Sequence, residues 1–282
     1  MTAADSAPAL RRWADLVWTD FAALDPTRTV AVLPLGATEQ HGPHLPLAVD
    51  TAIVEALLGA AAAHLPPDAP LLVLPTLAVG LSPEHEAFPG TLSLAPETAL
   101  AVLRDVAAGV ARAGVRKMVI VNGHGGHVGL LDVATRAMRV RHGLLVWSVP
   151  WWQLPLIETD GRDLLADLPP EEQRFGVHAG QLETAVMLAI APERVRRAAL
   201  RTFASSSQQR AQRYPLLGNG RSAKLAWCMQ DLHPEGAAGD AAAADADWGR
   251  RVLAAAGASL AQLLQEAMAV PLSTVQEGPC ER

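Results

Sequence analysis

Short apolar runs alternate with Ala- and Leu-rich stretches along the first half of the chain. The runs at 29–35, 71–75, 117–122 and 144–149 are rich in Val and Leu and predict buried strands. The stretches at 50–64, 95–114 and 128–142 predict helices. Buried strands that alternate with helices are typical of the α/β class. The pattern therefore predicts a mostly parallel central sheet with helices on both faces, as in a three-layer α-β-α sandwich.

The second half of the chain has a less regular pattern. Residues 151–176 read as a loop with a short helix, 180–190 as a helix and 245–270 as a long final helix. The polar, glycine-containing stretch 205–239 favours no element. No internal repeat and no linker divides the sequence, so we expect one domain over residues 1–282.

Composition narrows the classes of function. The chain has 282 residues, half of them hydrophobic, which is enough to bury a sizeable core. Its net charge is −6, and Lys and Arg form no stripe or cluster beyond short pairs. Phosphate contacts need concentrated positive charge, so nucleic acid is not an expected partner.

Cysteine usage and hydropathy bear on the compartment. Two cysteines, Cys228 and Cys280, are too few for a disulfide framework in a chain of this length. The amino-terminal segment lacks the apolar stretch of a signal peptide, and no run reaches the ~18 apolar residues of a membrane span. We therefore expect a cytoplasmic protein without a membrane partner.

Polar residues that suit a metal site follow the first predicted strand. Glu39 and His41 lie two positions apart, so their side chains point the same way in an extended segment. Asp50 stands at the start of the next helix. Two carboxylates and an imidazole favour a divalent cation. The alternative is that Asp50 only caps its helix and His41 is an ordinary surface residue.

Two further segments carry candidate residues. The glycine-rich loop after the third strand, NGHGGH at 122–127, presents His124 at a strand end, although a plain turn would read the same way. His178 and Glu183 flank the start of a predicted helix, where they could equally serve as a cap and as a charge that offsets the helix dipole. Cys228, beside a Trp, reads as a buried apolar residue, and no GxSxG or HExxH motif occurs.

Taken together, these segments resemble the creatininase family. The resemblance rests on LPLGATEQHGPHLPLAVD at 33–50, FPGTLSL at 88–94, VNGHGGH at 121–127 and HAGQLET at 178–184, in that order. It implies a three-layer α/β sandwich, assembled as a hexamer, that hydrolyses unusual C–N bonds with one or two divalent ions. Zn, Mn and Fe all tolerate such ligands.

The resemblance also implies roles for individual residues. Metal ligands would be Glu39, His41, Asp50 and His124, with Asp50 as a bridge, and His178 would transfer protons with a pKa suited to neutral pH. Creatininase proper has a further ligand, a Glu, two residues after the His of NGH. This chain has Gly126 there, and Glu183 is the candidate replacement.

The implied activity is hydrolysis of an amide or cyclic amide in a small molecule by a metal-activated water. Glu84 and His85 would edge the pocket and influence substrate choice. Two alternatives stay open: a metallopeptidase that acts on a small modified peptide, of the mycofactocin-maturation type, and a non-catalytic homologue that only binds a metal or a small molecule.

Overall fold

A four-stranded parallel sheet lies at the centre of the protein, in a computed structural model that describes residues 10–276 and 278. Cys280 therefore lies outside the described residues, as does the segment before residue 10. The strand order is β2-β1-β3-β4, and every neighbouring pair is parallel. The strands are β1 (Val30–Leu35), β2 (Leu71–Val73), β3 (Lys117–Asn122) and β4 (Leu145–Pro150).

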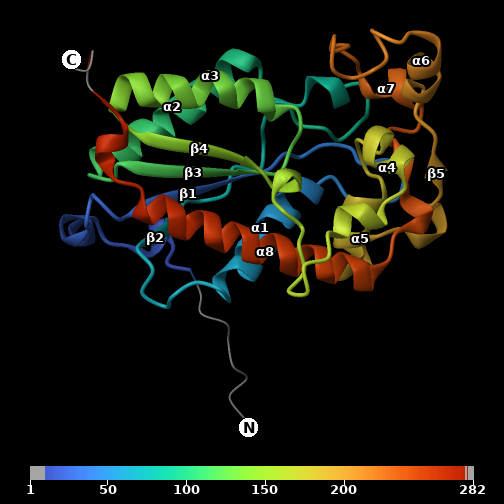
Figure 1. The fold of residues 1–282 in the computed structure, drawn as a ribbon. Coiled ribbons are helices and arrows are strands. Elements are labelled where there is room, and N and C mark those ends of the chain that lie inside the picture. Colours follow the sequence, from blue (N-terminus) through green and yellow to red (C-terminus); the bar gives the residue numbers. More distant parts are fainter. Residues whose placement is uncertain (1–9, 277, 279–282) are drawn as a thin grey trace.

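Helices cover both faces of this sheet (Figure 1). Successive side chains of a strand point to opposite faces, so Val30 and Val32 of β1 join one core cluster while Ala31 and Leu33 join the other. The fold is the predicted three-layer sandwich. The helices of the first face are α1 (Val49–Ala62), α5 (Gln181–Ile190) and α8 (Ala246–Ala269), and those of the second are α2 (Pro96–Arg112) and α3 (His127–His142).

The first of these clusters is built from both halves of the chain, because α5 and α8 pack on α1 and on the sheet. That shared core favours one domain, which stays a prediction for residues 1–282.

Most elements begin and end within two residues of the predicted positions, for local reasons. Pro96 occupies the first turn of α2, where its missing N–H costs nothing. Gly143 ends α3 with a φ of +64°, the left-handed conformation that glycine adopts freely. The strand β2 is two residues shorter than predicted. Pro75, within the predicted strand, has no N–H to donate to a sheet.

The remaining elements gather beyond the carboxyl ends of the strands (Figure 1). The stretch 205–239, for which the sequence favoured no element, contains two short helices and the start of a strand that pairs antiparallel with β5. These elements are α4 (Pro170–Phe175), β5 (Thr202–Phe203), α6 (Ser207–Arg213), α7 (Met229–Leu232) and β6 (Gly239–Asp240).

Among the described residues, α8 is one helix whose length and composition would allow it to cross a membrane. The sequence-based expectation concerned an unbroken run of ~18 apolar residues, and α8 contains none, because Gln262, Gln265 and Glu266 interrupt its Ala and Leu residues. Of the most apolar window, 44% is buried inside the protein, and the helix packs against α1 and α5. Its apolar side chains thus form part of the core.

Candidate metal centre

The residues predicted as ligands meet at the carboxyl edge of the sheet. Glu39 and His41 follow β1, and His124 follows β3, which is the neighbour of β1. Asp50 lies in the first turn of α1. Parallel strands end at the same edge, so segments distant in sequence come together there. All four residues are buried, and none is more than 4% exposed.

The carboxylate of Asp50 lies between two imidazoles. Its Oδ1 is 3.2 Å from Nε2 of His41, and its Oδ2 is 3.5 Å from Nδ1 of His124. The Nδ1 of His124 is also 3.1 Å from Oε2 of Glu39. Asp50 is therefore neither an exposed helix cap nor a surface residue, and its two oxygens face different imidazoles.

Backbone carbonyl groups fix which nitrogen each imidazole presents to the centre. A carbonyl oxygen only accepts, so Nδ1–H of His41 donates to the carbonyl of Glu39 at 3.0 Å. In the same way Nε2–H of His124 donates to the carbonyl of Leu81 at 3.0 Å. In the neutral rings, Nε2 of His41 and Nδ1 of His124 are therefore the nitrogens whose lone pairs face the carboxylates, the arrangement found in metal-ligating histidines.

A fifth residue reaches the same space from α5. Glu183 lies in the first turn of that helix, where its Oε2 accepts the N–H of Ala179 at 2.6 Å. The potential ligand atoms of His41, Asp50 and Glu183 lie within 4.8 Å of one another, and so do those of Glu39, Asp50 and His124. A third such group consists of Glu39, His41 and His178, and Asp50 belongs to the other two.

His178 lies beside these groups and is fixed by Gln40. Its Nε2–H donates to the Gln40 carbonyl at 2.7 Å, and its Nδ1 is 3.8 Å from Oε1 of Glu39. Burial, followed by the nearby charges of His41 and His85, lowers the pKa of His178 well below its ordinary value. This differs from the near-neutral pKa expected from the sequence, and it makes the imidazole neutral at pH 7.

Three carboxylates meet at the centre, and their pKa values diverge. Burial raises the pKa of Glu39, but the imidazoles of His124 and His41 outweigh it and lower that pKa. Burial, together with the charge of Glu39, raises the pKa of Asp50, and burial raises the pKa of Glu183 to about 7. Burial lowers the pKa of His41, but the carboxylate of Asp50 outweighs it and raises that pKa to about 9. Clustered acids that hold on to protons in this way suit a site that binds cations.

Several atoms of the centre have no hydrogen-bonding partner among the described residues. They are both carboxylate oxygens of Glu39, Nε2 of His41 and Oδ2 of Asp50, all fully enclosed. Burying a polar atom without a partner costs free energy. Four such electron-pair donors that face one space are best satisfied by a cation bound between them. Oxygen and imidazole nitrogen atoms are the ligands that Zn, Mn and Fe accept, so the residues fit a divalent ion.

Gly126 leaves no room for the Glu that creatininase proper has at this position. A Cβ built on Gly126 would lie 2.3 Å from Nε2 of His124 and 2.3 Å from Oε1 of Glu84. Any side chain here would push both groups away. The carboxylate of Glu183, which lies on α5, is instead close to the ligand atoms of His41 and Asp50.

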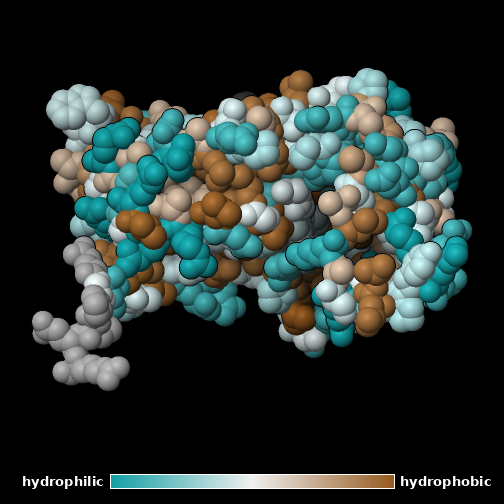
Figure 2. All heavy atoms as spheres, turned by 90° about the horizontal axis from the view of Figure 1, so that it is seen from above, coloured by the Kyte–Doolittle hydropathy of each residue, from teal (hydrophilic) through white to brown (hydrophobic). Residues whose placement is uncertain are grey.

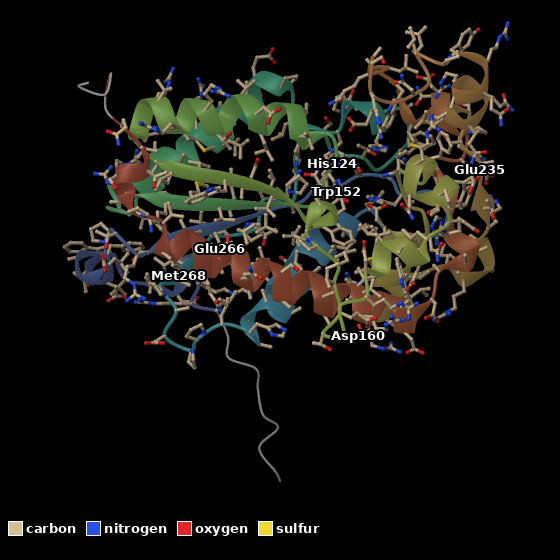
Figure 3. The ribbon with its side chains drawn as sticks, viewed as in Figure 1. His124, Trp152, Asp160, Glu235, Glu266 and Met268 are labelled. Atoms are coloured by element: carbon tan, nitrogen blue, oxygen red, sulfur yellow. The ribbon has the colours of Figure 1, made fainter. Side chains whose placement is uncertain are left out.

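A cavity of about 870 Å³ opens above the centre. The predicted pocket residues Glu84 and His85 do line it. Nε2 of His85 lies 3.4 Å from Oε1 of Glu39, so His85 touches the centre as well as the cavity. His124 and Trp152 lie near each other on its wall, where the sheet ends (Figure 3). Apolar residues border the hollow in the surface right of centre in Figure 2.

The sequence interpretation did not identify two residues, one at the cavity wall and one beside the centre. Cys228 was expected to be buried, but it is exposed at the cavity wall. No periodic pattern of apolar residues marks its segment, so the sequence does not indicate this exposure. Gln40 was overlooked although it lies inside the EQHGPH motif. Its side-chain amide donates to Nδ1 of His85 at 2.7 Å and lies 3.3 Å from Nε2 of His178.

His44 belongs to the same motif but serves the fold. It is fully buried, its Nε2–H donates to the carbonyl of Ala179 at 3.1 Å, and its ring stacks on Phe203. Burial lowers its pKa from 6.5 to about 4. Below pH 6.5 His44 becomes protonated in the unfolded chain but stays neutral in the folded protein. The stability that neutral His44 contributes is therefore fully present above pH 6.5 and is lost as the pH falls toward 4.

We expect His44→Gln to flatten the pH dependence of stability. Between pH 7.5 and pH 5 the free energy of unfolding of the wild type should fall by about 2 kcal/mol more than that of the variant, at 1.36 kcal/mol per unit of pKa difference. Urea unfolding of both proteins with chelator at the two pH values measures this. Identical pH dependence in the two proteins would show that His44 is not the responsible group.

Comparisons with known proteins agree with this geometry. The model of the family Creatininase, described as creatinine amidohydrolase, matches residues 14–264. The mycofactocin precursor peptide peptidase of Mycobacterium tuberculosis (strain H37Rv) is 35% identical over 238 residues, which cover 82% of this chain and 83% of the relative. The creatinine amidohydrolase of Pseudomonas putida is 29% identical over a region that covers 64% of this chain and 72% of the relative. The solved structure of a mutant creatininase of Zn-Zn type superposes with a TM-score of 0.70 at 24% identity. The match covers 92% of this chain and 98% of that structure's chain.

Proposed function

Because this chain belongs to the creatininase family of hydrolases, we propose that it cleaves an amide C–N bond with water, using divalent ions bound beneath its cavity. The observation that carries the proposal is the set of buried, partnerless atoms of Glu39, His41 and Asp50 that face one space at the edge of the sheet. A purely structural cluster would satisfy these atoms within the protein.

Two positions for an ion are supported by the arrangement of side chains. Glu39, Asp50 and His124 would hold one ion, and His41, Asp50 and Glu183 the other, so that Asp50 bridges. Zn, Mn and Fe suit these ligands, and the structural relative of Zn-Zn type favours two ions. When bound, such ions lower the pKa of a water molecule and polarise the carbonyl of an amide.

His178 is the residue that we assign to proton transfer. Its Nε2–H is held by the carbonyl of Gln40, which leaves Nδ1 as a base that faces the centre. A neutral imidazole can take a proton from the attacking water and pass it to the leaving nitrogen, which otherwise departs as an unstable anion. The low pKa of His178 keeps it in the accepting form at neutral pH.

The substrate class has two candidates. The first is a small molecule with an amide or cyclic amide, as for the creatinine amidohydrolase relative. The second is a small modified peptide, favoured by the higher identity to the mycofactocin precursor peptide peptidase. The cavity of about 870 Å³ is at the upper end of the range of ligand pockets and has room for either. Glu84 and His85 on its wall would contact the substrate.

Assembly and compartment are proposed on the family resemblance and on composition. We propose a homo-oligomer, a hexamer in the family's manner, that resides in the cytoplasm. Size-exclusion chromatography with light scattering tests the assembly, and a mass of one chain would contradict it.

We expect the purified protein, never exposed to chelator, to contain one or two divalent ions per chain. Elemental analysis measures them, and a panel of creatinine, cyclic amides and short peptides assays hydrolysis. Less than half an equivalent, with no gain on adding Zn, Mn or Fe, would contradict the metal site. Full occupancy without hydrolysis of any panel member would favour the non-catalytic alternative.

A further inference from the structure

Glu172 is a buried carboxylate at the junction of α4, α5 and β6, and no motif in the sequence marks it. It is 8% exposed, and backbone N–H groups are its partners. Its Oε1 accepts from Gln181, the first residue of α5, at 2.7 Å, and its Oε2 accepts from Asp240 in β6 at 2.8 Å. One side chain of α4 thereby connects α5 with β6, and α4 lies beside α5 in Figure 1.

Three glycines bring the backbone close to this carboxylate. A Cβ built on Gly176, Gly180 or Gly239 would lie 2.4, 2.4 or 2.8 Å from Oε1 of Glu172. No other residue type would leave space for the carboxylate at these positions. Two segments of the chain, the turn between α4 and α5 and the strand β6, therefore lie close to one oxygen atom of Glu172.

These segments carry the functional side chains of the second half. Gly180 and Gln181 precede Glu183 in the first turn of α5. His178 pairs with Ala238, whose carbonyl accepts from His178 at 3.3 Å and whose N–H donates back at 2.8 Å. Glu172 thus fixes the backbone on both sides of His178.

The turn between His178 and Glu183 needs such support. Ala179 has a φ of +52°, in the left-handed region that non-glycine residues seldom adopt. Conformations of this kind persist only where the surroundings impose them. The carboxylate of Glu172 also meets the amino-terminal end of α5, where the helix dipole favours a negative charge.

We propose that Glu172 is a positioning residue, which holds His178 and Glu183 against the metal centre without touching the reacting atoms. The role of those two residues rests on the proposed function. Both carboxylate oxygens of Glu172 already accept backbone N–H groups, so its contribution acts through the turn it holds.

Glu172→Ala and Glu172→Gln test the proposal, with Asp245→Asn as the matched control. Asp245 accepts the N–H of Trp248 at 2.7 Å at the start of α8, so its variant also loses a helix-capping carboxylate, but one away from the centre. We expect Glu172→Ala to lose one metal equivalent and about 10- to 100-fold in kcat, with KM little changed, as for residues that orient ligands. Glu172→Gln keeps one acceptor and should lose less. The control should keep its metal and kcat.

Hydrogen exchange of the metal-free proteins gives a readout that does not depend on activity. The backbone amides of residues 178–183 should exchange at least tenfold faster in both Glu172 variants than in the wild type. In the control their exchange rates should be unchanged. The proposal would be overturned if Glu172→Gln had the metal content, kcat and amide exchange of the wild type. It would also be overturned if Asp245→Asn lost as much metal and kcat as the Glu172 variants. If Glu172→Ala fails to fold, Glu172→Gln alone decides. A wild type that binds no metal would refute the proposed function, whereas the exchange result would still judge the positioning role.

Discussion

Replacing Asp50 with Ala is expected to remove both metal equivalents at once. The two oxygens of Asp50 face different imidazoles, and Asp50 belongs to both of the groups that we propose to hold ions. Its loss leaves each of these two groups with two side chains. A bound ion contributes several kcal/mol to the transition state, so we expect kcat to fall at least about 10³-fold. Elemental analysis after dialysis, and hydrolysis of whichever panel substrate the wild type accepts, measure the two effects.

His44→Ala is the control for this prediction, because His44 is equally buried in the same motif but donates to Ala179 and lies outside the ligand groups. We expect it to lose stability and to keep its ions at temperatures where it stays folded. Equal metal loss in the two variants would contradict the assignment of Asp50. Retention of one full equivalent in Asp50→Ala would show that the ions do not share it.

The sequence predicts the first half of this molecule well because its buried strands and helices have local patterns of apolar residues. A parallel strand covered on both faces is a continuous apolar run, so β1 and β3 were recognised directly. Their order as neighbours in the sheet then explains why Glu39 and His124, far apart in sequence, meet at one edge.

The second half depends on contacts that no local pattern reveals. Glu172 lies in a short exposed-looking helix, and its partners are backbone N–H groups of residues 9 and 68 positions away. The low pKa of His178 arises from burial and from His41 and His85, which belong to other loops. Cys228 sits in a stretch without apolar periodicity, where sequence alone does not distinguish a cavity wall from a core.

Glu183→Ala and His178→Ala are expected to fail in different ways. Glu183 is the only carboxylate that α5 brings to His41 and Asp50 among the described residues, and Gly126 has no room for a substitute. Glu183→Ala should therefore lose one equivalent of metal, and activity as a consequence. Added metal should restore part of the rate, because His41 and Asp50 still offer two ligands.

His178→Ala, in contrast, should keep its metal and its fold while kcat falls by about 10²–10⁴, the usual contribution of a general acid–base residue. The geometry makes this a demanding test, because Nδ1 of His178 also lies near Glu39 and His41 in a third group of potential ligands. Titration of both variants with metal, followed by hydrolysis at saturation, separates the two roles. At saturating metal the His178 variant should remain slow, since no ion replaces the base that accepts the proton from water. If His178→Ala loses metal and recovers its rate at saturation while Glu183→Ala does neither, the two residues have exchanged roles, with His178 as the ligand and Glu183, whose pKa is raised to about 7, as the proton carrier.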